Sequence, residues 1–176
     1  MTGPALVLVG PMGAGKTSIG KRLAKLLGTT FTDSDAAIVR EHGPIDRIFA
    51  EHGEPYFREV ERAAVAEALE RGGVVALGGG AVLHPETQRD LAAHRVVLLT
   101  VAPRNVAARI GGGSRPLLQD GDPVARWHEI HAARRPVYES VADVVFDTST
   151  GPLQQVVDAV AAWARQAESR PAGENA

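Results

Sequence analysis

The chain has 176 residues, 44% of them hydrophobic and 23% charged, which is ordinary for one globular domain with a full core. The net charge of -2 comes from interspersed acids and bases, so the sequence offers no basic surface for nucleic acid or an anionic membrane, and we expect a small-molecule partner. The absence of cysteine excludes disulfides, thiolate catalysis and cysteine-based zinc sites. Because the sequence has no charged leader with a long apolar segment, we expect a cytoplasmic protein.

Five short runs of β-branched or other apolar residues predict strands. In chain order they cover residues 5–10, 29–33, 74–78, 96–101 and 143–148. The first, third and fourth runs are nearly continuous in apolar residues, which is typical of strands that are covered on both faces. No internal repeat or linker divides the chain.

Helical patterns lie between these runs. One follows Lys16 and stops at Gly28, a second begins at Pro55, a third at Pro103, and the last follows Gly151. The alternation of strands and helices predicts an α/β fold with three layers, in which a parallel sheet lies between helices. We expect one domain over residues 1–168 and a disordered polar tail over residues 169–176.

A phosphate-binding loop follows the first strand. Gly10 is followed after four residues by Gly15, Lys16 and Thr17, and a helix then begins. The backbone N–H groups of such a loop surround phosphate oxygens, and the helix N-terminus adds partial positive charge. Lys16 is expected to reach the terminal phosphates of a nucleotide and Thr17 to bind Mg2+. An ordinary turn with a surface lysine would not require this combination of strand, spacing, Lys-Thr pair and helix.

The rest of the sequence separates the classes of phosphate-loop protein. A GTPase switch would carry D-x-x-G and N-K-x-D segments, and neither is present. A motor ATPase usually ends an apolar strand in an aspartate, whereas the runs at 74–78 and 96–101 end without one. These absences favour a small-molecule kinase.

Two aspartates follow the second predicted strand. Asp33 and Asp35 are two residues apart, so both side chains can point towards the edge of the sheet where ligands bind in α/β proteins. One carboxylate could support Mg2+ through water while the other holds a hydroxyl for attack. The alternative is a pair of helix caps, because aspartate is a favoured cap residue. The spacing does not decide between these interpretations.

Two glycine-rich segments and several arginines complete the candidate site. The GGGA segment at 78–81 indicates backbone that lies close to a ligand. Arg115 lies in a glycine-rich segment at about 109–123, which suits a lid that closes over phosphates, although a disordered loop is the alternative. Arg58 and Arg134 lie in helical or pre-proline contexts, where an isolated arginine is usually solvated.

Taken together, the ordered blocks of the chain resemble shikimate kinase from about residue 5 to about residue 165. The blocks are LVGPMGAGKTSIGKRLAKLLG, FTDSD, IDRIFAEHGEPYFREVE, ALGGGAV, SRPLL and RRPVYESVAD. The resemblance implies ATP-dependent phosphorylation of the shikimate 3-hydroxyl on the route to chorismate and the aromatic amino acids. It also implies a five-stranded parallel sheet of the nucleoside-monophosphate-kinase type and a monomeric protein.

The resemblance also assigns roles to individual residues. ATP phosphates are assigned to Gly13, Ala14, Gly15, Lys16, Thr17, Ser18 and the lid residue Arg115; Mg2+ to Thr17 and, through water, Asp33; and shikimate to Asp35, Arg58, Gly79 and Arg134. Lys16, Asp35 and Arg115 are the expected catalytic residues. Because phosphoryl transfer depends mainly on alignment and charge neutralisation, an ordinary Asp35 with a pKa of about 3.9 would suffice.

The chain departs from the family pattern in two places. The stretch before IDRIF is about one residue shorter than expected, and DTSTGP after the last strand lacks the arginine that many relatives place near adenine. The R-x-P-x-Y spacing selects Arg134 rather than Arg135. The rival interpretations are a gluconate or nucleoside-monophosphate kinase and a catalytically idle nucleotide-binding module.

Overall fold

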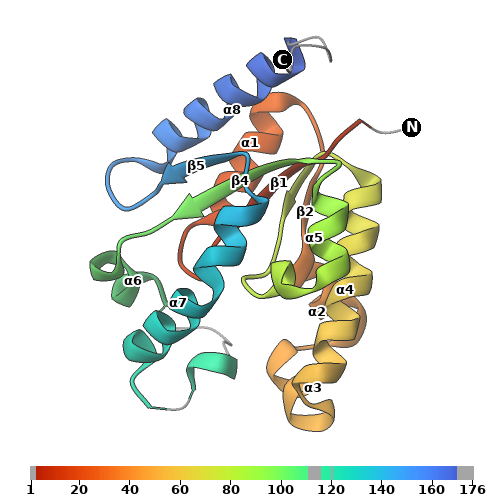
Figure 1. Ribbon diagram of the computed structural model, residues 1–176, viewed down its shortest axis with the longest axis vertical. Helices are drawn as coiled ribbons and strands as arrows, with labels where there is room; N and C mark the ends of the chain where they lie inside the picture. Colours follow the sequence, from red (N-terminus) through yellow and green to blue (C-terminus); the bar gives the residue numbers. More distant parts are fainter. Residues whose placement is uncertain (1–2, 111–115, 120, 170–176) are drawn as a thin grey trace.

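A five-stranded sheet forms the centre of the molecule. The computed structural model describes residues 3–110, 116–119 and 121–169. All strands run parallel in the order β2-β3-β1-β4-β5 (Figure 1). They are β1 (Leu6–Val9), β2 (Phe31–Asp33), β3 (Val74–Ala76), β4 (Arg95–Thr100) and β5 (Val144–Asp147). The predicted strands are confirmed, with ends that differ by one or two residues.

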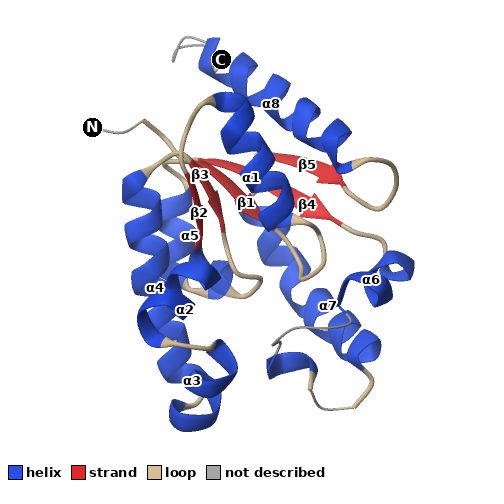
Figure 2. Ribbon diagram, turned by 180° about the vertical axis from the view of Figure 1, so that it is seen from behind, coloured by secondary structure: helices blue, strands red, loops and turns tan. Residues whose placement is uncertain are grey.

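Helices cover both faces of the sheet and confirm the three-layer prediction. They are α1 (Lys16–Leu27), α2 (Ser34–His42), α3 (Ile45–His52), α4 (Glu54–Arg71), α5 (Pro85–Leu91), α6 (Pro103–Ile110), α7 (Pro123–Val141) and α8 (Leu153–Ser169), with short 3-10 turns η1 (Ala81–Leu83) and η2 (Pro116–Leu118). Figure 2 shows α1 and α8 in front of the sheet, with α4, α5 and α7 behind it. No helix in the described ranges is long and apolar enough to cross a membrane.

The central strand β1 shows why both faces are covered. Leu6 and Leu8 pack into the core beneath α1 and α8, whereas Val7 and Val9 pack into the core beneath α4. All four side chains are buried, because alternate residues of a strand point to opposite faces. A strand at the centre of a sheet that is covered on both faces therefore needs apolar residues at every position.

The helix boundaries agree with the sequence signals in part. α1 ends before Gly28 and α6 begins at Pro103, as predicted, and α4 begins one residue before Pro55. The periodicity does not predict α3, α5 or α7. Ser169, the first residue of the predicted tail, closes α8, and residues 170–176 lie outside the described part of the chain.

Candidate functional site

The phosphate loop joins β1 to α1 and closes tightly against the sheet. Gly10 and Gly15 have φ angles of 143° and 88°, which residues with a side chain rarely adopt. A Cβ on Gly10 would lie 2.2 Å from the Leu99 carbonyl oxygen, so no larger residue fits there. Lys16 Nζ donates to the carbonyl oxygens of Gly10 (2.7 Å) and Pro11 (2.9 Å). The ammonium group therefore lies across the loop, at the N-terminus of α1.

Thr17 and Asp33 bring two oxygen ligands together beside this loop. Thr17 Oγ1 donates to Asp33 Oδ2 at 2.5 Å, and Asp33 Oδ1 accepts from the Ala36 backbone N–H at 3.1 Å. Asp33 is thus the N-cap of α2, and Asp35 lies in the first turn of that helix. Hydroxyl and carboxylate oxygens are ligands that Mg2+ accepts, usually together with waters and substrate phosphates. The pair fits such an ion.

Asp35 has an unusual electrostatic environment. Burial raises its pKa from 3.8 to about 6, and the negative charges of Asp33 and Glu61 act in the same direction. Lys16 and Arg58 oppose the shift without cancelling it. The pKa of Asp35 therefore lies above the ordinary value that would suffice for its expected role, and the sequence could not show this because the spacing of two aspartates says nothing about how deeply either is buried.

The glycine loop after β3 lies against the three charged side chains predicted to bind shikimate. A Cβ on each glycine would meet one of them. The added Cβ would lie 2.5 Å from Asp35 Oδ1 at Gly78, 3.2 Å from Arg134 Nη1 at Gly79 and 2.5 Å from Arg58 Nη1 at Gly80. Three consecutive glycines allow the charged groups to reach the backbone without displacement.

Two hydroxyl groups hold the backbone of this loop. The Gly78 N–H donates to Ser34 Oγ at 2.9 Å, and the Gly79 carbonyl accepts from the Tyr138 hydroxyl at 2.5 Å. Among the described residues, neither the Gly79 nor the Gly80 N–H makes a hydrogen bond. These two donors remain available at the edge of the site.

Arg58 and Arg134 are held in the site rather than solvated, contrary to the usual behaviour of an isolated arginine. Arg58 donates to buried Glu61 at 2.7 Å and to Glu54 at 3.1 Å. Burial raises the pKa of Glu61, and the Arg58 charge opposes that rise. Arg134 is 7% exposed, whereas the neighbouring Arg135 points outward and pairs with Glu139. The structure therefore brings Arg134 and not Arg135 to the glycine loop.

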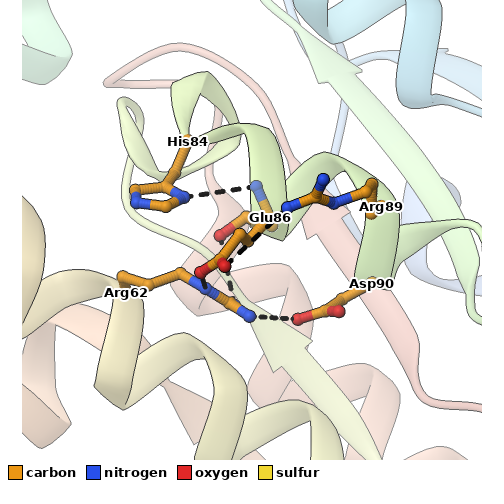
Figure 3. A network of polar contacts seen from close by, with 6 residues as sticks. Arg62, His84, Glu86, Arg89 and Asp90 are labelled. Carbon is orange, nitrogen blue, oxygen red and sulfur yellow. Dashed lines mark hydrogen bonds and ion pairs between the residues drawn. The ribbon is translucent and has the colours of Figure 1, made fainter.

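A polar network links α4 to α5, the helix that follows the glycine loop and η1. Arg62 of α4 donates to Asp90 at 2.5 Å and to Glu86 at 3.4 Å, both on α5. Figure 3 shows the guanidinium group pointing to both carboxylates, with His84 accepting from the Glu86 backbone at the start of the helix. The helix that carries Arg58 and Glu61 is thus linked to the segment that follows the glycines.

The site contains two adjoining cavities. The larger, of about 520 Å³, lies over the phosphate loop and includes Thr17 and Asp33 in its lining. The smaller, of about 170 Å³, is lined by Arg58, Arg134 and an apolar wall that includes Phe49, Phe57 and Leu117. Met12, Asp35 and Gly79 line both. A donor in the larger cavity and an acceptor in the smaller one would meet beside Asp35.

Comparison with known proteins agrees with this geometry. A sequence model of the shikimate kinase family matches residues 12–165. The shikimate kinase of Thermobifida fusca is 45% identical over 161 residues, which cover 90% of this chain and 93% of that protein. The chain belongs to the shikimate kinase family. Its activity is that of a shikimate kinase, a phosphorylation in the shikimate pathway with ATP as co-substrate.

Solved structures show the same relationship. Shikimate kinase from Acinetobacter baumannii in complex with shikimate superposes with a TM-score of 0.90 at 34% identity, over 96% of this chain and 97% of that one. A gluconokinase from Sinorhizobium meliloti superposes with a TM-score of 0.61 at 22% identity, over 94% of each chain. The second likeness shows a shared fold alone, so the gluconate kinase interpretation gains no further support.

Sequence reasoning missed Arg109, which lines the larger cavity of this shikimate kinase family member. Arg109 Nη1 donates to the Gly13 carbonyl at 3.1 Å, and Nη2 donates to the Thr148 carbonyl at 2.7 Å. The buried Thr148 hydroxyl in turn donates to the Ala14 carbonyl at 2.8 Å. The available signal was the position of Arg109 at the start of the glycine-rich segment.

The other predicted nucleotide-binding residues divide into three groups. Gly13, Gly15 and Ser18 line the larger cavity, whereas Ala14 is fully buried behind it. Arg115 lies outside the described residues, as do residues 111–114 and 120 of the predicted lid. The described part of that lid includes η2, which lies against α3 beside the smaller cavity.

Proposed function

We propose that the chain transfers the terminal phosphoryl group of ATP to the 3-hydroxyl of shikimate at the junction of the two cavities. The observation that carries the proposal is the position of Asp35, which lines both cavities beside Lys16 and Arg58. The phosphoryl donor in the larger cavity and the acceptor hydroxyl in the smaller one would then be aligned around the Asp35 carboxylate.

The donor side consists of the phosphate loop and the adjacent oxygens. The backbone from Gly13 to Ser18 and the N-terminus of α1 would bind the ATP phosphates, with Lys16 leaving its loop carbonyls to contact the transferred group. Thr17 would hold Mg2+ directly and Asp33 through water. When bound, Mg2+ neutralises phosphate charge. Arg115 is proposed to add a further positive charge from the lid.

The acceptor side is suited to a carboxylate and a hydroxyl. Two guanidinium groups, Arg58 and Arg134, would bind the shikimate carboxylate in a directional manner that lysine does not offer. The free N–H of Gly79 would add a backbone contact. Asp35 would orient the attacking hydroxyl, whose oxygen bonds to phosphorus as the bond to the ADP oxygen breaks, and would accept its proton.

Two further proposals concern the assembly and the location of the enzyme. We propose that the enzyme is a monomer and acts in the cytoplasm. Light scattering at several concentrations tests the first of these, and a constant mass of one chain is the expected result.

The product identifies the reaction. The two-dimensional ¹H–³¹P NMR spectrum of the product formed from ATP and shikimate should couple the new phosphorus signal to the proton on carbon 3. Coupling to the proton on carbon 4 or carbon 5 would contradict the proposed orientation of the acceptor.

Arg134 provides the sharpest test of acceptor binding. Arg134→Ala is expected to raise the KM for shikimate at least about 30-fold, because one partner of a desolvated charge pair contributes about 2 kcal/mol or more. The KM for ATP should change little. The matched control is Arg135→Ala, which removes an exposed arginine from the next position of the same helix. Steady-state kinetics with each substrate varied would measure both effects, and equal values for the two variants would contradict the assignment.

The mutational test of Arg58 needs a double variant, because the buried Glu61 carboxylate is paired with the Arg58 guanidinium. Arg58→Ala would leave a buried carboxylate without its partner and would destabilise the fold as well as substrate binding. The double variant with Glu61→Gln removes that uncompensated charge. We expect the double variant to remain folded and to show a raised KM for shikimate.

A further inference from the structure

Helix α7 presents three buried side chains on one face. Trp127, Arg134 and Tyr138 are separated by seven and four residues, which places them along the same side of the helix. Trp127 belongs to the core on the α1 and α8 side of the sheet, and Tyr138 belongs to the core on the α4 side. α7 extends from the sheet past the ends of the strands (Figure 1). One rigid element thus connects the two cores at the site.

Tyr138 fixes the loop on the acceptor side. Its hydroxyl donates to the Gly79 carbonyl at 2.5 Å, and the side chain is 1% exposed. Burial raises the pKa of Tyr138, with the nearby Arg134 guanidinium opposing the shift, so the hydroxyl keeps its proton at neutral pH. The Gly79 carbonyl therefore has a permanent donor. The same residue lies beside Arg134, so Tyr138 contacts the loop where the proposed acceptor site is built.

Trp127 fixes the loop on the donor side. Its indole Nε1 donates to the Met12 carbonyl at 2.8 Å, and the side chain is also 1% exposed. His131 stacks on the indole with ring centroids 4.7 Å apart and planes at 18°. The stack restrains the plane of the indole and hence the direction of its N–H. Met12 is part of the phosphate loop and lines both cavities.

We propose that Trp127 and Tyr138 are positioning residues through which α7 aligns the phosphate loop with the glycine loop. This inference rests on the proposed function, because it assumes a donor over one loop and an acceptor against the other. Each bond satisfies a loop carbonyl, and losing it would release the loop as well as leave a polar group unpaired. Phosphoryl transfer is sensitive to displacements of the order of an ångström, so the position of each loop affects the kinetics.

The hydroxyl of Tyr138 can be removed alone. Tyr138→Phe is expected to raise the KM for shikimate roughly three- to tenfold, the effect of losing one buried hydrogen bond, and to leave the KM for ATP within about twofold. Tyr56→Phe is the matched control, because Tyr56 is 46% exposed on α4 and should leave both constants unchanged. Calorimetric titration with shikimate should show the same loss of affinity without turnover.

The indole N–H can be removed in the same way. Trp127→Phe is expected to raise the KM for ATP roughly three- to tenfold and to lower kcat, with a smaller effect on the KM for shikimate. Trp163→Phe, on α8, is the control for loss of a partly buried indole outside α7. The thermal unfolding midpoint of each variant shows that the folded protein is being measured.

The outcomes separate the possibilities. Selective changes in the two KM values support the alignment role, whereas folded variants with lower unfolding midpoints and unchanged kinetic constants would overturn it. If one variant does not fold, the other still tests the loop that its residue contacts, the phosphate loop for Trp127 and the glycine loop for Tyr138. Failure of the proposed function would appear instead as a wild-type protein without shikimate turnover.

Discussion

Asp35→Asn is expected to lower kcat by roughly 10²- to 10⁴-fold while the protein remains folded. The amide can still contact a hydroxyl, but it cannot accept the proton that leaves during transfer. Stopped assays at high shikimate and ATP concentrations would measure the loss. Asp158→Asn, on the exposed surface of α8, is the control. A folded Asp35→Asn protein with the wild-type rate would remove Asp35 from the mechanism.

The same substitution should stabilise the protein at neutral and alkaline pH. The pKa of Asp35 is raised from 3.8 to about 6, so the folded state binds its proton more tightly than the unfolded state. The stability that this proton provides is fully present below pH 3.8 and is lost as the pH rises through 6. Asparagine carries no such dependence. We expect the free energy of unfolding at pH 8 to increase by about 1–3 kcal/mol and the gain to be small at pH 4.

Urea unfolding of wild-type and variant protein at the two pH values isolates this effect. The difference between the proteins cancels the titration of groups that lie too far from Asp35 to interact with it. A gain at pH 4 equal to that at pH 8 would point to a packing effect. A loss at pH 8 would show that the ionised carboxylate is stabilising and that its pKa is not raised.

Lys16→Met is expected to reduce phosphoryl transfer roughly 10³-fold or more, because the ammonium group neutralises charge on the transferred phosphate. We expect the fold to persist, since methionine has a similar length and the hydrogen bonds of Lys16 to the Gly10 and Pro11 carbonyls are only partly buried. Lys21→Met, on the outer surface of α1, is the matched control and should retain activity. Rapid-quench measurement of a single turnover would detect the loss even if product release limits the steady state. Retained transfer would remove the phosphate-loop assignment.

The sequence predicted the architecture well because strand and helix signals are local. Continuous apolar runs identified β1, β3 and β4, and the phosphate-loop motif placed a turn between a strand and a helix. α7 escaped prediction because Pro136 interrupts its helical signal and because one buried position carries Arg134 where an apolar residue is expected.

The site could be predicted only where a motif names its residues. The two aspartates left a choice between caps and functional groups, and the structure makes Asp33 the cap of α2 and places the partly buried Asp35 in the lining of both cavities. Arg109 has partners 96 and 39 residues away in the sequence, so its place at the start of the glycine-rich segment could not reveal what it binds. The partner of Arg58 lies three residues further along α4, but only burial makes that Glu61 different from a surface acid.

The most direct test of the whole account is the choice of acceptor. ADP release should be measured in a coupled assay with shikimate, gluconate, AMP or no acceptor, at the same protein and ATP concentrations with Mg2+. The account predicts rapid release with shikimate and a rate with each of the other three that does not exceed the slow background. Equal release with and without shikimate, or faster release with gluconate or AMP, would contradict it.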